Sequence, residues 1–189
     1  MNFNALGRRV KTAFLGLALL TTLSIGVPTI PTAKAAFGGS TEALLLSCID
    51  YRVVNETEAY MSGRGLKDKY DHIILAGASL GATNTVYPGW GQTFIEHVDV
   101  AIKLHNIHKV IILDHRDCGA YRVFLKQEGL DKDRAKENKV HLEQMNALAE
   151  TIQKKYPQLD VELAIIDLEG KVEDLGEKKG KGEHVEAHH

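Results

Sequence analysis

Apolar residues along the chain fall into four short, nearly continuous runs separated by longer mixed segments. The runs are ALLLSCI (43–49), HIILAG (72–77), KVIILDH (109–115) and VELAIID (161–167). Strands that are covered on both faces have such continuous apolar runs, whereas half-exposed strands alternate apolar and polar residues. The pattern therefore predicts four buried strands.

The segments between these runs are long enough to form helices that cross from one strand to the next. Within 92–107, the residues that fall on one helical face are Phe94, Val98, Ala101, Ile102 and His105. The segment from about 133 to 156 repeats this spacing, and Pro157 ends it. Alternating strands and helices predict an α/β fold with a mostly parallel central sheet, flanked by helices and joined by right-handed crossovers.

The first 35 residues have the features of an export signal. A basic front, Arg8, Arg9 and Lys11, precedes the apolar stretch AFLGLALLTTLSIGV, and AKA (33–35) has small residues where a signal peptidase cleaves. We predict a signal peptide over 1–35 and an exported protein, periplasmic or extracellular, by the general or the twin-arginine route. A retained membrane anchor is the alternative, although the apolar stretch is short for a membrane span.

The rest of the chain is acidic overall. Removing the four basic residues of the leader from the 23 of the chain leaves 19 against 25 acidic residues, a formal charge of −6. The bases are also interleaved with acids, so we expect a small-molecule ligand, no nucleic acid, and no membrane after signal cleavage. The length is enough for one domain, over 36–178, and the polar stretch 179–189 is predicted to be a disordered tail.

Two stretches with reactive side chains stand at the ends of predicted strands. SCIDYR has Cys48, Asp50 and Arg52 at alternate positions, and DHRDC has His115 and Cys118 three positions apart. Ligands of parallel sheets bind beyond the carboxyl ends of the strands, which is where both stretches lie. We therefore expect them to form one site.

The chain has only two cysteines, and with one histidine they form a possible metal site. Cys48, Cys118 and His115 make a Cys2His set, which zinc accepts, with a fourth position left for water. A helix N-terminus expected at Cys118 would favour its thiolate form. A single disulfide is the competing interpretation for an exported protein with two cysteines. The polar residues Asp50 and Arg52, which a disulfide does not need, favour the metal.

The residues beside the three ligands have predicted roles. Period-2 spacing directs Cys48, Asp50 and Arg52 to the same side of the chain. Asp50 then either caps the fourth metal position or accepts a hydrogen bond from water there, and Arg52 can hold the Asp50 carboxylate away from the metal. Gly77, in the glycine-rich stretch GASLG, and Gly119, directly after the second cysteine, are predicted to approach the substrate closely.

These motifs together resemble those of the β-class carbonic anhydrases. That family is marked by Cys-x-Asp-x-Arg after its first strand and by His-x-x-Cys-Gly after a later one, and both are present here as CIDYR (48–52) and HRDCG (115–119). Ala76-Gly77 and the stretches FIEHVDVAIKLHNIHKVIILDHRDCGA and IIDLEGKVEDL are similar to further family segments in order and spacing. The resemblance covers about residues 43–175.

The resemblance implies a zinc lyase, a carbonate dehydratase that hydrates carbon dioxide reversibly to bicarbonate with a zinc-bound hydroxide. It implies that Cys48, His115 and Cys118 hold Zn2+, that Asp50 orients the hydroxide within an Asp–Arg pair, and that a homodimer or higher even homo-oligomer forms. Two thiolates make zinc-bound water less acidic than imidazoles would, so activity is expected to rise above neutral pH. Arg116 is interpreted as a solvated loop charge or as a bicarbonate contact.

The chain also departs from the family pattern. Asp114 stands where a glycine usually precedes the metal-binding histidine, and Ile74-Leu75 replaces the usual Arg-Asn. No counterpart is evident for the N-terminal helices that wrap a dimer partner. These departures leave the substrate open. Hydrolysis of carbonyl sulfide or carbon disulfide at the same site is the alternative reaction, and a zinc-binding or disulfide-bonded protein without turnover is the alternative outside enzymes.

Overall fold

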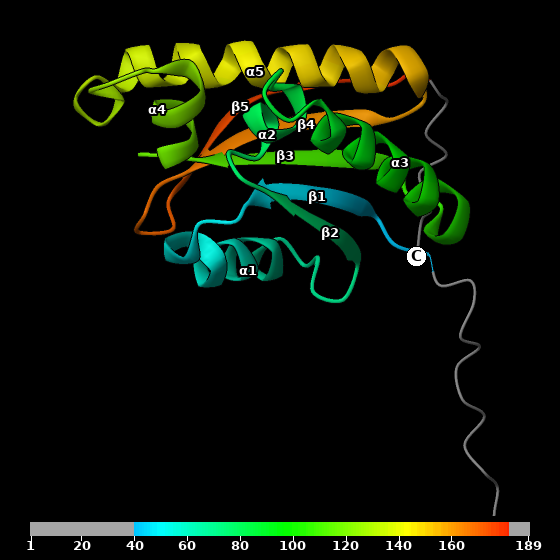
Figure 1. Ribbon diagram of the computed structural model, residues 1–189. Coiled ribbons are helices and arrows are strands. Elements are labelled where there is room, and N and C mark those ends of the chain that lie inside the picture. The colour runs from blue at the N-terminus through cyan, green and yellow to red at the C-terminus, as the bar shows by residue number, and fades with distance from the viewer. Residues whose placement is uncertain (1–39, 182–189) are drawn as a thin grey trace, which may run out of the picture. The chain divides into compact units, whose positions relative to one another are not determined.

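The computed structural model describes residues 40–181, and within this range the chain forms one five-stranded sheet with helices on both faces (Figure 1). The strands are β1 (Ala43–Cys48), β2 (Tyr70–Leu75), β3 (Lys109–His115), β4 (Asp160–Ile166) and β5 (Val172–Lys178). Their order across the sheet is β2-β1-β3-β4-β5. Strands β1 to β4 are parallel to one another, and β5 is antiparallel to β4. The predicted mostly parallel α/β fold is confirmed.

The helices are unequally divided between the two faces of the sheet (Figure 1). One face packs against α2 (Ser79–Thr83), α3 (Pro88–His105), α4 (Gly119–Leu125) and α5 (Arg134–Lys155), with the short 3-10 turn η2 (Leu130–Lys132) before α5. The other face packs against α1 (Val54–Gly63), which follows the 3-10 turn η1 (Tyr51–Val53). The two long helices are those that the apolar spacing predicts.

Burial on both faces explains why the inner strands are mostly apolar. All six residues of β1 are buried, Ser47 among them. Leu44 belongs to the core cluster that contains Phe94 of α3 and Met145 of α5, whereas Leu45 belongs to the cluster that contains Met61 of α1. Successive side chains of a strand point to opposite faces, so a strand between two helical layers has apolar residues at most of its positions.

The edge strand β5 was not among the predicted strands. Its sequence, VEDLGEK, is mostly polar, and none of its residues is fully buried. It follows β4 through a tight turn in which the Asp167 carboxylate accepts the N–H groups of Glu169 and Lys171. A solvent-facing antiparallel edge needs little apolar area, so the apolar pattern does not indicate it.

The first three residues of the predicted tail, 179–181, are hydrogen-bonded to the rest of the chain. Gly180 N donates to Asp160 Oδ1 over 2.7 Å, and Lys181 N donates to Pro157 O over 2.6 Å, so residues 179–181 are attached to the sheet. The rest of the predicted tail and the predicted signal peptide lie outside the described residues. Among the described helices, none has the length and apolar character needed to cross a membrane.

Candidate metal centre

Three potential ligands meet at the carboxyl ends of β1 and β3. Cys48 is the last residue of β1 and His115 is the last residue of β3, and these two strands are parallel neighbours. Cys118 lies three residues after His115, at the N-cap of α4. The ligand atoms of the three side chains lie within 4.8 Å of one another, and all three residues are buried.

The arrangement of these atoms fits a tetrahedral metal ion. The two sulfur atoms lie 3.9 Å apart and are not bonded to each other, and tetrahedral zinc with Zn–S bonds of about 2.3 Å would separate them by roughly 3.8 Å. His115 Nδ1 lies 2.8 Å from the carbonyl oxygen of Arg116 and must donate to it, because a carbonyl only accepts. The lone pair on Nε2 is therefore available to a metal ion. Nε2 is buried and has no hydrogen-bond partner among the described residues.

The two thiols differ in acidity. A hydrogen bond from the Cys118 thiol, assisted by His115 and by the N–H of Gly77, lowers the pKa of Cys48 to about 4. The same hydrogen bond, together with burial, raises the pKa of Cys118. Either sulfur can be the donor in this pair, and the N–H of Gly77 favours negative charge on Cys48. Metal binding must release the proton that the two sulfur atoms share.

A carboxylate lies beside the ligands and is held by an arginine. Asp50 Oδ1 accepts the backbone N–H and the Nε–H of Arg52, both over 3.0 Å, and Asp50 Oδ2 accepts Arg52 Nη2 over 2.8 Å. Asp50 Oδ2 also lies 3.8 Å from His115 Nε2. The guanidinium fork lowers the pKa of Asp50 to about 2, so the group is a carboxylate at neutral pH.

The two predicted glycines lie at the edge of the ligand cluster. Gly77 N donates to Cys48 Sγ over 3.2 Å, and a Cβ at this position would lie 2.8 Å from the Cβ of Ala120. Gly119 is the first residue of α4, and no atom lies within 4 Å of the position that its Cβ would occupy. The close backbone approach at Gly77 is thus directed at a ligand sulfur. The predicted substrate contacts of both glycines stay predictions.

Comparison with known proteins identifies the family. A family described as "Putative carbonic anhydrase" matches residues 39–176. The chain belongs to this family. It is 39% identical over 135 residues to an uncharacterized protein of Rickettsia bellii (strain RML369-C), covering 71% of this chain and 82% of that protein. An uncharacterized protein of Rickettsia conorii (strain ATCC VR-613 / Malish 7) is 40% identical over 134 residues, covering 71% of this chain and 72% of that protein.

Solved structures of β-carbonic anhydrases are also similar. The wild-type enzyme CafD of Aspergillus fumigatus aligns with a TM-score of 0.48 and 18% identity, over 78% of this chain and 95% of that chain. The carbonic anhydrase of Glaciozyma antarctica aligns with a TM-score of 0.46 and 15% identity, over 74% of this chain and 84% of that chain. The predicted resemblance to the carbonic anhydrases, as a divergent member, is confirmed by the family match.

Within this carbonic anhydrase family member, the unusual Asp114 forms a buried polar cluster behind the ligands. Asp114 Oδ2 accepts hydrogen bonds from Ser79 Oγ, Tyr121 OH and His141 Nδ1, at 2.7, 2.6 and 2.7 Å, and Oδ1 accepts Ser79 N. Burial alone would raise the pKa of Asp114, but the hydrogen bond from His141 and the other donors hold it below its usual value. The carboxylate at the end of β3 therefore binds the start of α2, helix α4 and helix α5.

The interpretation of Arg116 as a solvated loop charge is wrong. Its side chain is 9% exposed, and it donates to Glu137 over 2.7 Å and to Glu173 over 2.8 Å. A further bond reaches the side chain of Asn138 over 2.8 Å. These partners come from α5 and β5, so Arg116 holds the loop between His115 and Cys118 against the neighbouring elements.

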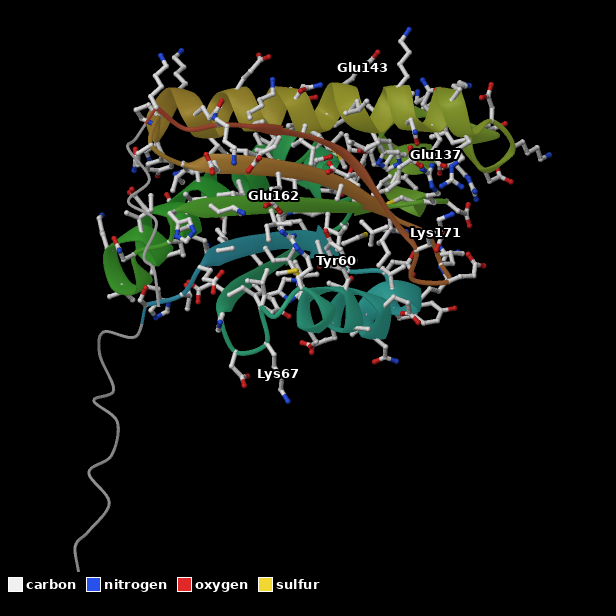
Figure 2. All side chains as sticks on the ribbon, turned by 180° about the vertical axis from the view of Figure 1, so that it is seen from behind. Tyr60, Lys67, Glu137, Glu143, Glu162 and Lys171 are labelled. Carbon is white, nitrogen blue, oxygen red and sulfur yellow. The ribbon has the colours of Figure 1, made fainter. Side chains whose placement is uncertain are left out.

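The residues that hold the loop were not predicted from the sequence. Glu137, which Figure 2 shows at the beginning of α5, accepts both Arg116 Nη1 and the N–H of Asp117. Glu137 and His141 stand four residues apart in α5, and both are buried. In the sequence, the only signal is that these two polar residues fall on the same side of the helix. The sequence does not distinguish them from the many exposed charged residues around them.

Proposed function

We propose that this protein is an exported zinc-dependent carbonic anhydrase that interconverts carbon dioxide and bicarbonate. The observation that carries the proposal is the combination of three buried donor atoms, on Cys48, His115 and Cys118, with a carboxylate fixed 3.8 Å from the histidine ligand atom. A metal site with three protein ligands and one open position is typical of catalytic zinc, whereas structural zinc has four protein ligands.

The residues beside the fourth metal position have different proposed roles. When bound, zinc would supply the nucleophile, because it acidifies the water that it holds. Asp50 is oriented by the Arg52 fork, and its Oδ2 faces the ligand cluster as a hydrogen-bond acceptor. Gly77 N–H stabilises negative charge on the Cys48 sulfur. Asp50 thus has the position and the charge to orient a proton-bearing reactant at the metal.

The test is a measurement of zinc content together with stopped-flow carbon dioxide hydration on the protein without its leader. We expect about one zinc per chain and hydration that becomes faster from about pH 7 to about pH 9. One zinc without hydration would contradict the proposed substrate, and carbonyl sulfide and carbon disulfide would then be assayed with the same preparation. Absence of both zinc and free thiols would return the two cysteines to the disulfide interpretation.

Export and assembly are further parts of this proposal. The basic and apolar leader supports export, and N-terminal sequencing of the protein recovered from its producing cells should begin at residue 36. The solved relative from Sordaria macrospora is described as tetrameric. We propose an even homo-oligomer here too. Sedimentation equilibrium of the zinc-loaded protein should give an even multiple of the mass of one chain, such as that of a dimer or a tetramer.

A further inference from the structure

The guanidinium of Arg52 is bound on two sides by two different carboxylates. Nε and Nη2 donate to Asp50, as described above. On the opposite side Nη1 donates to Asp117 Oδ2 over 2.9 Å, and Nη2 also donates to the Asp117 carbonyl oxygen over 3.1 Å. Asp117 comes from the loop between His115 and Cys118, which is 65 residues away in sequence. Arg52 therefore bridges the two stretches that carry the metal ligands.

Asp117 is itself held by its surroundings. Its φ is 53°, in the left-handed region that asparagine, aspartate and glycine adopt most readily. Its N–H donates to Glu137 Oε1 over 2.8 Å, and Glu137 is buried and also paired with Arg116. The backbone of Asp117 is thus fixed by α5, and this conformation presents both its carbonyl oxygen and its carboxylate to Arg52.

We propose that Asp117 is a positioning residue, which fixes the Arg52 guanidinium so that Asp50 keeps a single orientation beside the metal ligands. The effect on catalysis rests on the proposed function. The Arg52 side chain is 31% exposed, so water competes for its donors, and a guanidinium with a partner on one side only can pivot about that partner. A second carboxylate on the opposite side removes this freedom.

Electrostatics agree with this arrangement. The hydrogen bonds to Asp50 and then to Asp117 raise the pKa of Arg52 above its ordinary value. Asp117 thus contributes to a shared charge network and not only to the shape of the loop.

Two variants remove the carboxylate partner without requiring a different loop backbone, and both keep the backbone carbonyl of residue 117. Asp117→Asn keeps the size of the side chain and tolerates the left-handed conformation, and Asp117→Gly removes the side chain in a conformation that suits glycine. The matched control is Arg122→Gln. Arg122 lies 3.5 Å from the other Asp117 oxygen and is 60% exposed, so this variant changes the charge around Asp117 and leaves Arg52 untouched.

The first readout needs neither metal nor activity. In 15N-labelled metal-free protein, the Arg52 side-chain N–H signals are assigned by their loss in Arg52→Gln. We expect slow solvent exchange and restricted rotation of the guanidinium in wild type and in Arg122→Gln, and fast exchange in both Asp117 variants. Unchanged Arg52 signals in the Asp117 variants would overturn the proposal, whatever their activity.

The second readout is kcat for hydration by the zinc-loaded protein. Asp117→Asn should lower kcat roughly tenfold, as expected for loss of a hydrogen bond between charged groups, with zinc content unchanged. In a protein that already carries Arg52→Gln, Asp117→Asn should cause no further loss of kcat. A further loss on that background, or an unchanged kcat despite a mobile Arg52, would overturn the proposal. If wild type shows no hydration, the proposed function fails, and the NMR result alone decides whether Asp117 fixes Arg52.

Discussion

At the scale of single residues, each group at the centre has its role limited by the hydrogen bonds that it already makes. His115 can offer a metal only Nε2, because Nδ1 donates to a carbonyl. Both oxygens of Asp50 accept from Arg52, which fixes the carboxylate with Oδ2 3.8 Å from His115 Nε2. The first two predictions concern such single groups.

Asp50→Asn should lower carbon dioxide hydration by about a hundredfold or more while leaving about one zinc per chain, because it removes the acceptor charge but no ligand. Zinc content by mass spectrometry and stopped-flow rates measure the two quantities. His115→Ala is the comparison, since it should lose zinc and activity together. Unchanged hydration in Asp50→Asn would remove Asp50 from the chemistry.

Gly77→Ala and Gly119→Ala form a matched pair. Gly77 has a φ of +83° and no room for a Cβ, so alanine there should lower the free energy of unfolding by about 1–3 kcal/mol and weaken zinc binding. Gly119 has an open position, so alanine there should change the free energy of unfolding by less than about 0.5 kcal/mol. Urea unfolding and competition with a chromophoric zinc chelator measure both effects. Equal effects at the two positions would contradict this assignment.

At the scale of elements, the loop between the metal ligands depends on α5 as much as on β3 and α4. Helix α5 contributes Glu137 to the loop backbone and His141 to Asp114. Both side chains are buried, so removal of either leaves a buried polar partner without one of its hydrogen bonds. The next two predictions test this dependence.

Glu137→Gln should lower the free energy of unfolding by about 2–3 kcal/mol, because it takes away the more buried of the two carboxylates that pair with Arg116. Arg134→Gln is the control. Its side chain is 56% exposed and pairs only with Glu173 among the described residues, so the loss should be below about 1 kcal/mol. Chemical unfolding followed by circular dichroism compares the two. A similar, small loss in both variants would show that Glu137 is not needed to hold the loop.

Asp114 should make stability depend on acid pH. Its pKa is held below the usual value of about 3.9, so it contributes stability above that pH and loses this contribution as the pH falls through its folded-state pKa. Asp114→Asn should therefore be less stable than wild type at pH 7, and the difference should shrink below about pH 4. Unfolding of both proteins, metal-free, across this range measures it. A difference that does not change with pH would rule out the charge as its origin.

At the scale of the whole molecule, the site joins segments from most of the described chain, so a bound metal should stabilise the entire fold. Removal of zinc by a strong chelator should lower the unfolding temperature, because an ion that binds only the folded state stabilises it by about 2.7 kcal/mol at a hundred times its Kd. The same treatment should expose both thiols to slow alkylation, since Cys48 and Cys118 are buried. Calorimetry and intact mass measure these effects. Identical unfolding with and without chelator would contradict a zinc site.

The sequence by itself determined the inner part of the fold and the identity of the candidate ligands. Buried parallel strands are apolar at most positions, so β1 to β4 could be recognised from local composition, within about two residues of their observed bounds. The prediction that all four are buried is wrong for β2, which is an edge strand with only Ile73 buried. The two motifs place Cys48, His115 and Cys118 at strand ends, and topology brings such ends together.

Only the tertiary structure decided what holds these residues in place. Arg116, Asp117 and Asp114 take partners that stand 20 or more residues away, on α5, β5 and the turn after β1. Which charged residue of α5 faces the loop depends on how the helix packs across the sheet, and no local pattern records that choice. The polar edge strand β5 was undetectable for a related reason: its backbone hydrogen bonds to β4 define it, and its side chains do not.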